Sequence, residues 1–356
     1  NGQPVGENPV SFKALEKITA EGEVLDVSGQ LATDFTGIVN PTVKDSKMTV
    51  TCLKNNNQDD SPAFTFTDYP NTIFIGNDSV RNGKFSFTFT VPKDISYSNL
   101  QGKMNLYAVD TESGNEAQGN FDNFIVGGTS DTAETDTIGP EIRALYLNDT
   151  TFVDGGQVNT TPYFVAELWD KSGVNITGSS VGHDMMLVID ESTVLSYNLN
   201  SYYELLPGEE GTGIVKFPIP ALEPGKHTAE FWVWDILNNS TVRTFTFEVV
   251  EGLKPFLFDV IATPGIAREQ VTFHLMHNRP ESRMRVGIMV YDLAGRQLWK
   301  HEESGTSGLF ENYTVSWDLT SGGARMRPGV YIYRAAISTD NSKDATKARK
   351  FIILGE

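Results

Sequence analysis

The feature that most constrains the fold of this chain is a recurring alternation of apolar and polar residues with a period of two. It occurs in residues 84–91 (KFSFTFTV), 228–234 (TAEFWVW), 242–249 (VRTFTFEV) and 329–334 (GVYIYR). Successive side chains of a β-strand point to opposite faces, so each stretch predicts a strand with one buried and one solvated face. Helical periodicity is nearly absent, and Gly, Asn, Asp and Pro separate the strands at short intervals. This pattern predicts an all-β chain built of sandwiches.

Two linkers divide the 356 residues. Residues 127–140 are small, polar and acidic and cannot fill a core, and residues 251–255 (EGLKP) follow a strongly predicted strand. We therefore predict three consecutive immunoglobulin-like β-sandwich domains, at residues 1–127, 138–251 and 254–356. Each has about the size of one such sandwich.

The charge of the chain limits its partners. It has 28 basic and 46 acidic residues and a net charge of −18. An acidic surface repels phosphate backbones and anionic lipids, so we expect no nucleic-acid partner and no binding to lipid by bulk charge. No apolar run approaches the roughly 18 residues of a membrane-spanning helix, so none is expected. The first residues, NGQP, have no features of a signal peptide, and we interpret the chain as a mature or excised piece of a longer polypeptide.

The single cysteine, Cys52, excludes a disulfide within the chain and a cysteine-rich zinc site. Large secreted animal proteins usually carry several disulfides, so the single cysteine of this chain mildly favours a bacterial source. Cys52 lies in a β-like run, residues 48–53 (MTVTCL), and we expect a small core residue in a strand. No glycine-rich turn exposes its sulfur, and no Gly-x-Ser-x-Gly motif occurs. We therefore expect no catalytic residue in this chain.

Three histidines occur in arrangements that deserve a test. His274 and His277 would be a ligand pair on a helix, but residues 271–275 (VTFHL) predict a strand, on which they point to opposite faces. His183 precedes Asp184, and a carboxylate beside an imidazole either orients a ligand or satisfies a polar corner. We favour the second interpretation, a loop that holds two strands.

Acidic turn residues leave calcium open as an alternative to the absence of any cofactor. Ca²⁺ takes six to eight oxygen ligands, and the best candidates here are Asp170, Asp184 and Asp190. No D-x-D-x-D-G loop is present, so these three remain weak candidates for a metal site.

Exposed aromatic residues would indicate carbohydrate binding. The tryptophans are Trp169, Trp232, Trp234, Trp299 and Trp317. Trp232 and Trp234 share one face of a strand, and we expect this face to be core. A loop-like region also offers possible surface contacts at Tyr197, Tyr202 and Tyr203.

An ordered set of short motifs spans nearly the whole chain. It comprises residues 22–29 (GEVLDVSG), 34–37 (DFTG), 82–87 (NGKFSF), 91–95 (VPKDI), 122–128 (DNFIVGG), 136–142 (DTIGPEI), 172–175 (SGVN), 182–184 (GHD), 222–227 (LEPGKH) and 235–240 (DILNNS). This order resembles the region that follows the catalytic domain in gingipain-like cysteine peptidases of the PorU family, from the type IX secretion system of Bacteroidota. No single motif is specific, whereas their order is.

The third predicted domain has a resemblance of its own. Its motifs are residues 291–296 (YDLAGR), Trp317 with Asp318, and residues 328–333 (PGVYIY). They resemble the flagellar-hook-cap type of immunoglobulin-like domain and the C-terminal domains that type IX cargo carries.

The family resemblance implies a parent sortase on the extracellular face of the outer membrane, reached through the periplasm. The family removes the C-terminal signals of cargo and helps to attach cargo to lipopolysaccharide. Its catalytic domain lies upstream and is absent here, and Cys52 does not match the motif of its nucleophile. The chain is then a non-catalytic scaffold and protein-interaction segment. Its implied partners are that upstream domain, an outer-membrane barrel protein of the PorV type, other attachment-complex components and cargo C-terminal domains. The alternative is a glycan-binding or adhesive module of a bacterial surface protein.

Overall fold

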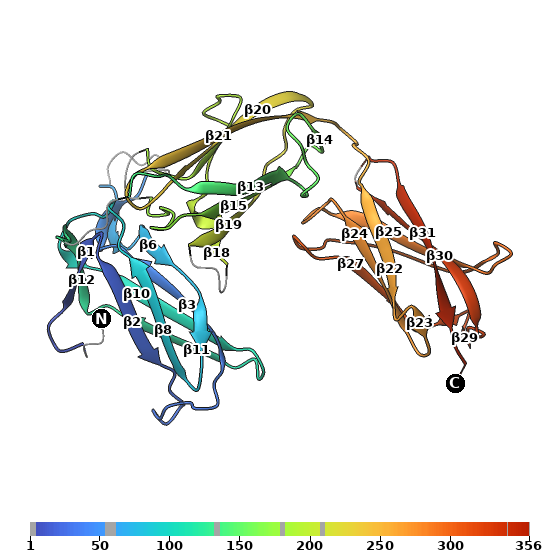
Figure 1. Ribbon diagram of the computed structural model, residues 1–356, viewed down its shortest axis with the longest axis horizontal. Coiled ribbons are helices and arrows are strands. Elements are labelled where there is room, and N and C mark those ends of the chain that lie inside the picture. Colours follow the sequence, from blue (N-terminus) through green and yellow to red (C-terminus); the bar gives the residue numbers. More distant parts are fainter. Residues whose placement is uncertain are drawn as a thin grey trace. The chain divides into compact units, whose positions relative to one another are not determined.

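The computed structural model describes residues 5–53, 62–131, 136–178, 182–206, 211–339 and 341–355 (Figure 1). Its regular elements are β-strands, apart from one 3₁₀-helical turn at Asn200–Tyr202. The predicted all-β fold class is therefore confirmed. No helix of the described residues is long and apolar enough to cross a membrane.

The first part of the chain forms four small sheets. Their orders are β1-β12-β9, β11-β10-β3-β6 with β7 beside β3, β2-β8 and β4-β5. The strands are β1 (Val10–Ala14), β2 (Lys17–Glu23), β3 (Gly37–Lys44), β4 (Met48–Thr51), β5 (Thr65–Asp68), β6 (Thr72–Ile75), β7 (Asp78–Val80), β8 (Lys84–Thr90), β9 (Leu100–Gln101), β10 (Lys103–Asp110), β11 (Glu116–Phe121) and β12 (Phe124–Thr129).

Phenylalanines join three of these sheets, those of β1, β6 and β8, in a shared core. Phe87 and Phe89 of β8 are buried, as their period of two predicts. The Phe89 ring lies 4.8 Å from that of Phe74 on β6 and 5.9 Å from that of Phe12 on β1. Aromatic pairs at these distances contribute roughly 0.5–1.5 kcal/mol beyond their buried area. Strand β8 therefore packs against two other sheets at once.

Cys52 is exposed, so the expectation of a buried core residue in a strand was wrong. Strand β4 ends at Thr51, one residue before Cys52. It pairs with β5 in a two-stranded sheet, and β5 is exposed along its whole length. The β-like run forms the predicted strand, but both faces of this two-stranded sheet are largely exposed among the described residues.

The middle part of the chain forms two sheets with the orders β13-β15-β19-β18 and β14-β21-β20-β16-β17. Their strands are β13 (Glu141–Leu147), β14 (Gln157–Val158), β15 (Tyr163–Trp169), β16 (Met186–Ile189), β17 (Ser196–Asn198), β18 (Tyr203–Leu205), β19 (Thr212–Pro218), β20 (Gly225–Trp234) and β21 (Ser240–Val249).

The predicted strand at 228–234 faces the other way from the expectation. Phe231 and Val233 of β20 are fully buried, whereas Trp232 and Trp234 are only half-buried. Alternation alone cannot decide which of two apolar faces is the core, because both faces of this strand carry large apolar residues. The expectation that both tryptophans fill the core was wrong.

The last part forms a sandwich of the sheets β22-β24-β27 and β23-β31-β30-β25-β26, with a small β28-β29 hairpin. Phe273 of β24 lies 4.9 Å from Tyr333 of β30, ring to ring, so the two sheets share a core. The strands are β22 (Leu257–Thr263), β23 (Ile266–Ala267), β24 (Val271–His277), β25 (Met284–Tyr291), β26 (Gln297–Gly305), β27 (Tyr313–Trp317), β28 (Thr320–Ser321), β29 (Ala324–Arg325), β30 (Gly329–Ser338) and β31 (Ala345–Ile353).

Two compact units emerge from the packing. One comprises residues 1–145, 166–216 and 228–244, and the other comprises residues 146–165, 217–227 and 245–356. The division into three domains at 1–127, 138–251 and 254–356 stays a prediction. Part of the first predicted linker, residues 132–135, lies outside the described residues.

Candidate functional site

A buried carboxylate joins two distant parts of the first compact unit. Asp94 follows β8, and its side chain is 9% exposed. Its Oδ2 lies 2.6 Å from His183 Nδ1, and its Oδ1 accepts a hydrogen bond from Asn238 Nδ2 at 2.9 Å. Asn175 Nδ2 also donates to Oδ2, at 3.4 Å. Hydrogen bonds to a charged group each stabilise a fold by about 1.5–3 kcal/mol.

The backbone strengthens this joint, since Lys93 N donates to Ile236 O at 2.8 Å. The His183 ring also packs 4.5 Å from Trp234. His183 therefore satisfies a polar corner, but its carboxylate is Asp94 rather than its neighbour Asp184. The sequence could not indicate this pair, because 89 residues separate its members.

A second cluster brings together the carboxylates of Asp136, Asp170 and Asp235. One oxygen of each lies within 4.8 Å of the others. Asp170 follows β15 and Asp235 follows β20, and both are buried. Asp170 Oδ1 accepts hydrogen bonds from the backbone N–H groups of Ser172 and Gly173, and Ser172 Oγ donates to Asp136 Oδ2 at 2.8 Å. Turns that begin with aspartate therefore converge here from three segments.

Burial and mutual repulsion set the electrostatics of the cluster. Burial raises the pKa of Asp170 to about 6, with further contributions from the charges of Asp235 and Asp136. Burial also raises the pKa of Asp235, against hydrogen bonds from Asn239 that lower it. Hydrogen bonds from Ile138 N and Ser172 Oγ lower the pKa of Asp136 instead. The cluster can hold a proton on its buried members, and its oxygen donors are of the kind that Ca²⁺ prefers.

Of the three calcium candidates from the sequence, only Asp170 belongs to this group. Asp184 Oδ1 accepts a hydrogen bond from Asn200 Nδ2 at 2.7 Å, and Asp190 Oδ1 accepts one from Thr228 N at 2.9 Å. Asp136 and Asp235 are members of the cluster that were not among the predicted candidates. Each begins a turn beside a strand, as Asp170 does. This shared sequence pattern could have identified both as members of the cluster.

His274 and His277 lie on β24, so the predicted strand is confirmed for this pair. His277 Nε2 lies 2.9 Å from Ser307 Oγ, and its Nδ1 accepts a hydrogen bond from Arg279 N at 3.0 Å. Burial and the nearby Arg279 charge lower the pKa of His277 to about 4. The contacts of His277 are therefore those of a structural residue. The imidazole of His274 does not face it.

Arg279, which the sequence analysis did not single out, is 1% exposed. Its Nη2 donates to the backbone oxygens of Leu253 and Lys254 at 3.1 and 3.3 Å, and its Nη1 donates to Asn278 O and Oδ1. Its Nε is buried without a hydrogen-bond partner. The predicted linker at 251–255 is thus tied by its backbone to a buried guanidinium.

The remaining aromatic candidates occupy varied surroundings. Trp169 lies under the Arg143 guanidinium at 5.1 Å, and Trp317 is buried against Trp299 with a ring distance of 4.4 Å. Tyr203 is buried and Tyr202 is 39% exposed. Tyr197 is half-buried. Among these side chains, Tyr202 is exposed, whereas Tyr203 and Trp317 are buried.

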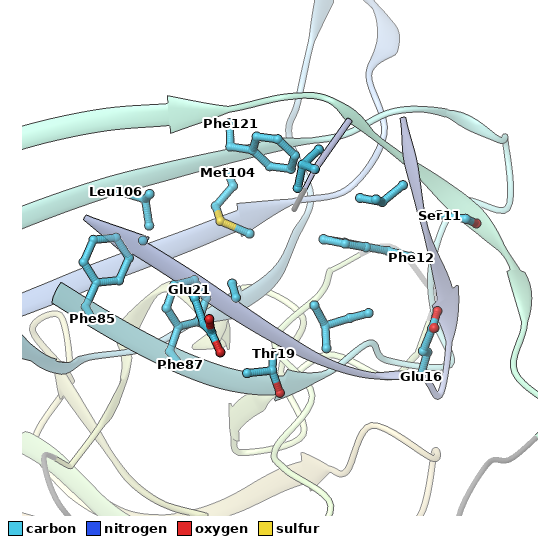
Figure 2. Close-up of a pocket in the computed structure, with 15 residues that line it drawn as sticks. Ser11, Phe12, Glu16, Thr19, Glu21, Phe85, Phe87, Met104, Leu106 and Phe121 are labelled. Carbon is cyan, nitrogen blue, oxygen red and sulfur yellow. The ribbon is translucent and has the colours of Figure 1, made fainter. Parts of the chain in front are cut away.

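An apolar groove of about 520 Å³ opens in the first part of the chain (Figure 2). Its walls come from β1, β2, β8, β10 and β11. Figure 2 shows Phe12, Phe85, Phe87, Met104 and Phe121 directed into a common space. The polar side chains around it include Ser11, Glu16, Thr19 and Glu21. Pockets lined mainly by apolar and aromatic groups are the usual form of a binding site.

The chain is similar to a solved structure of dimeric latent PorU from Porphyromonas gingivalis. The two sequences are 37% identical over 98% of this chain, with a TM-score of 0.41. The chain spans 32% of the length of that protein. No protein-family model and no curated protein matches the chain.

Two further similar structures come from animal proteins. The Ig1-2 module of the Drosophila receptor protein tyrosine phosphatase DLAR is 9% identical, covers 62% of this chain and is itself fully covered, with a TM-score of 0.24. The FN1-FN3 domains of chicken CNTN1 are 8% identical over 97% of this chain and 98% of their own, with a TM-score of 0.22. Both consist of immunoglobulin-like or fibronectin-like domains.

Proposed function

Because this chain belongs to the PorU family and is homologous to the C-terminal region of PorU, we propose that it is the non-catalytic β-sandwich region of a type IX secretion sortase. That parent enzyme is a gingipain-like cysteine endopeptidase that removes the C-terminal signals of cargo at the cell surface. The observation that carries the proposal is the 37% identity over 98% of the chain. The region acts as scaffold and protein-interaction segment on the extracellular face of the outer membrane.

Two structural features support the scaffold role. The Asp94 joint fixes segments from two successive β-rich parts of the first compact unit through a buried, multiply bonded carboxylate. Arg279 likewise fixes the backbone of residues 253–254. Such contacts restrain the orientation of neighbouring segments, which a scaffold requires.

The partners that follow from this role are the upstream catalytic domain of the same polypeptide, an outer-membrane barrel protein of the PorV type and other attachment-complex components. Cargo C-terminal domains are further partners of the parent enzyme. In a bacterium that encodes the parent, deletion of this region should leave cargo with its C-terminal signal still attached. Replacement of the parent's catalytic cysteine, with this region intact, provides the comparison.

Mass spectrometry of secreted cargo reads out that experiment. Full processing of cargo without the region would contradict the proposal. The alternative, a glycan-binding module, is tested on a glycan array with the intact chain. Robust and selective binding to one sugar would favour that alternative over the scaffold.

A further inference from the structure

Three sheets end at the groove in Figure 2. Strand β1 is the last of β1-β12-β9, β11 is the last of β11-β10-β3-β6, and β2 belongs to the two-stranded sheet β2-β8. These strand orders are those of the part of the chain that the structure describes. A sandwich whose sheets end side by side has a seam at which a further extended segment fits, because edge strands are the usual sites of strand addition.

Apolar side chains of the core are only partly covered at this seam. Phe85, Leu106 and Phe121 pack on the core cluster and remain half-buried. The inward residues of β2 decrease in size from Ile18 to Ala20 and Gly22. The Phe85 ring packs directly over Gly22, since a Cβ atom there would lie 2.3 Å from it, and this ring forms part of the groove wall. Covering this exposed apolar surface with another apolar chain would lower the free energy of the complex.

The length of the groove suits a short strand. Five consecutive residues of β2, from Ile18 to Gly22, line it. At about 3.3 Å per residue this corresponds to roughly 17 Å, the length of a strand of five to six residues. A strand of that length directs every second side chain into the groove.

The charge at the rim of the groove further restricts which segments can bind. Glu16 and Glu21 are the charged residues among the described residues that line the groove, and none of these is a lysine, arginine or histidine. Glu21 alternates with the inward residues Ala20 and Gly22, so its carboxylate lies on the solvent side of β2, at the rim. The chain as a whole carries a net charge of −18. Basic residues that flank an apolar strand would therefore be attracted to this rim, and acidic ones would be repelled.

We propose that this groove binds an extended peptide segment of a protein partner, with alternating apolar side chains and basic flanking residues. The segment lies along β2 and directs its apolar side chains toward Phe85, Leu106 and Phe121. The inference rests on the proposed function, because it specifies the interaction surface of the scaffold. An acyl chain would also fill an apolar groove, but it would gain nothing from the two rim carboxylates.

The test uses the intact 356-residue chain and the fluorescein-labelled peptide KKVTVSVKK. Two control peptides isolate pattern and charge: KKVVVTSKK has the same composition without alternation, and EEVTVSVEE has the opposite charge. Fluorescence anisotropy at low salt should show that both controls bind about tenfold more weakly or worse. Hydrogen exchange should show new protection of residues 17–23 with the first peptide alone.

A matched pair of variants locates the site. Glu21→Lys reverses a charge on the rim, and Glu112→Lys makes the same change in an exposed turn outside the groove. Glu21→Lys should weaken binding of the basic peptide about fivefold at low salt, since a single exposed charge pair contributes up to about 1 kcal/mol. Glu112→Lys should leave binding unchanged.

Equal binding of all three peptides, or protection elsewhere than residues 17–23, would overturn the inference. Binding of sodium decanoate, seen as new protection of residues 17–23 without any binding of the basic peptide, would replace it with an acyl-chain site. Absence of peptide binding, while deletion of the region still blocks cargo processing, would refute the groove alone. Full processing of cargo without the region would refute the proposed function separately.

Discussion

Acidification should destabilise the C-terminal sandwich, residues 257–353, through the partly buried imidazole of His277. The pKa of this side chain falls from 6.5 to about 4 in the folded state because burial and the neighbouring Arg279 charge oppose protonation. As the pH falls below 6.5, the unfolded chain takes up the proton first, which favours unfolding. The stability linked to His277 is therefore present above pH 6.5 and lost as the pH falls toward 4.

The size of this effect follows from the pKa difference. A difference of one pKa unit corresponds to about 1.4 kcal/mol, so a fall from 6.5 to about 4 corresponds to about 3 kcal/mol. That is a large fraction of the typical stability of a domain, which is about 5–15 kcal/mol.

Urea unfolding at pH 7.5 and at pH 4.5, followed by hydrogen exchange of peptides that cover β24 and β27, measures the change in this sandwich alone. The His277→Gln variant removes the imidazole and should lose most of the pH dependence between these conditions. His274→Gln makes the same substitution three residues earlier on β24 and controls for the change of residue type. An unchanged pH dependence in His277→Gln would refute the argument.

Three further predictions concern other parts of the chain. Asp94→Ala should lower the free energy of unfolding of the first compact unit by about 1–3 kcal/mol, because it removes the acceptor of His183 and Asn238 at a partly buried site; calorimetry measures this. Asp170→Asn should stabilise the fold at pH 7.5 by about 1–2 kcal/mol, because the raised pKa of about 6 means that ionisation above it opposes folding; the gain should disappear near pH 4. Cys52 should react completely with a thiol reagent in the native protein, because it is exposed.

Each of these has a result that would contradict it. Asp122→Ala, at an exposed aspartate, is the control for Asp94→Ala. An equal loss in the free energy of unfolding in both variants would contradict the stabilising role of the Asp94 hydrogen bonds. A lower melting temperature of Asp170→Asn at pH 7.5 would show that its hydrogen bonds, or a bound cation, outweigh the repulsion. Reaction of Cys52 only in denaturant would contradict the exposed hairpin.

Local sequence patterns were sufficient to predict the strands, because the alternation of side chains along a strand involves only residues that are close in sequence. The alternation in residues 84–91 and 329–334 became β8 and β30, and the run before Cys52 became β4. The all-β class followed from such runs and is confirmed by the strands. The resemblance to the C-terminal region of PorU followed from the order of short motifs and is confirmed by 37% identity over 98% of the chain.

Only the tertiary structure decided which faces and which distant residues meet. It buried Phe231 and Val233 instead of Trp232 and Trp234, because both faces of β20 are apolar and the facing layer selects one. It exposed Cys52, which follows a two-stranded sheet of β4 and β5 that is largely exposed on both faces among the described residues. It paired His183 with Asp94 and assembled Asp136, Asp170 and Asp235 from three turns. Burial and contacts across long stretches of chain depend on the packing of whole sheets, which a period of two does not specify.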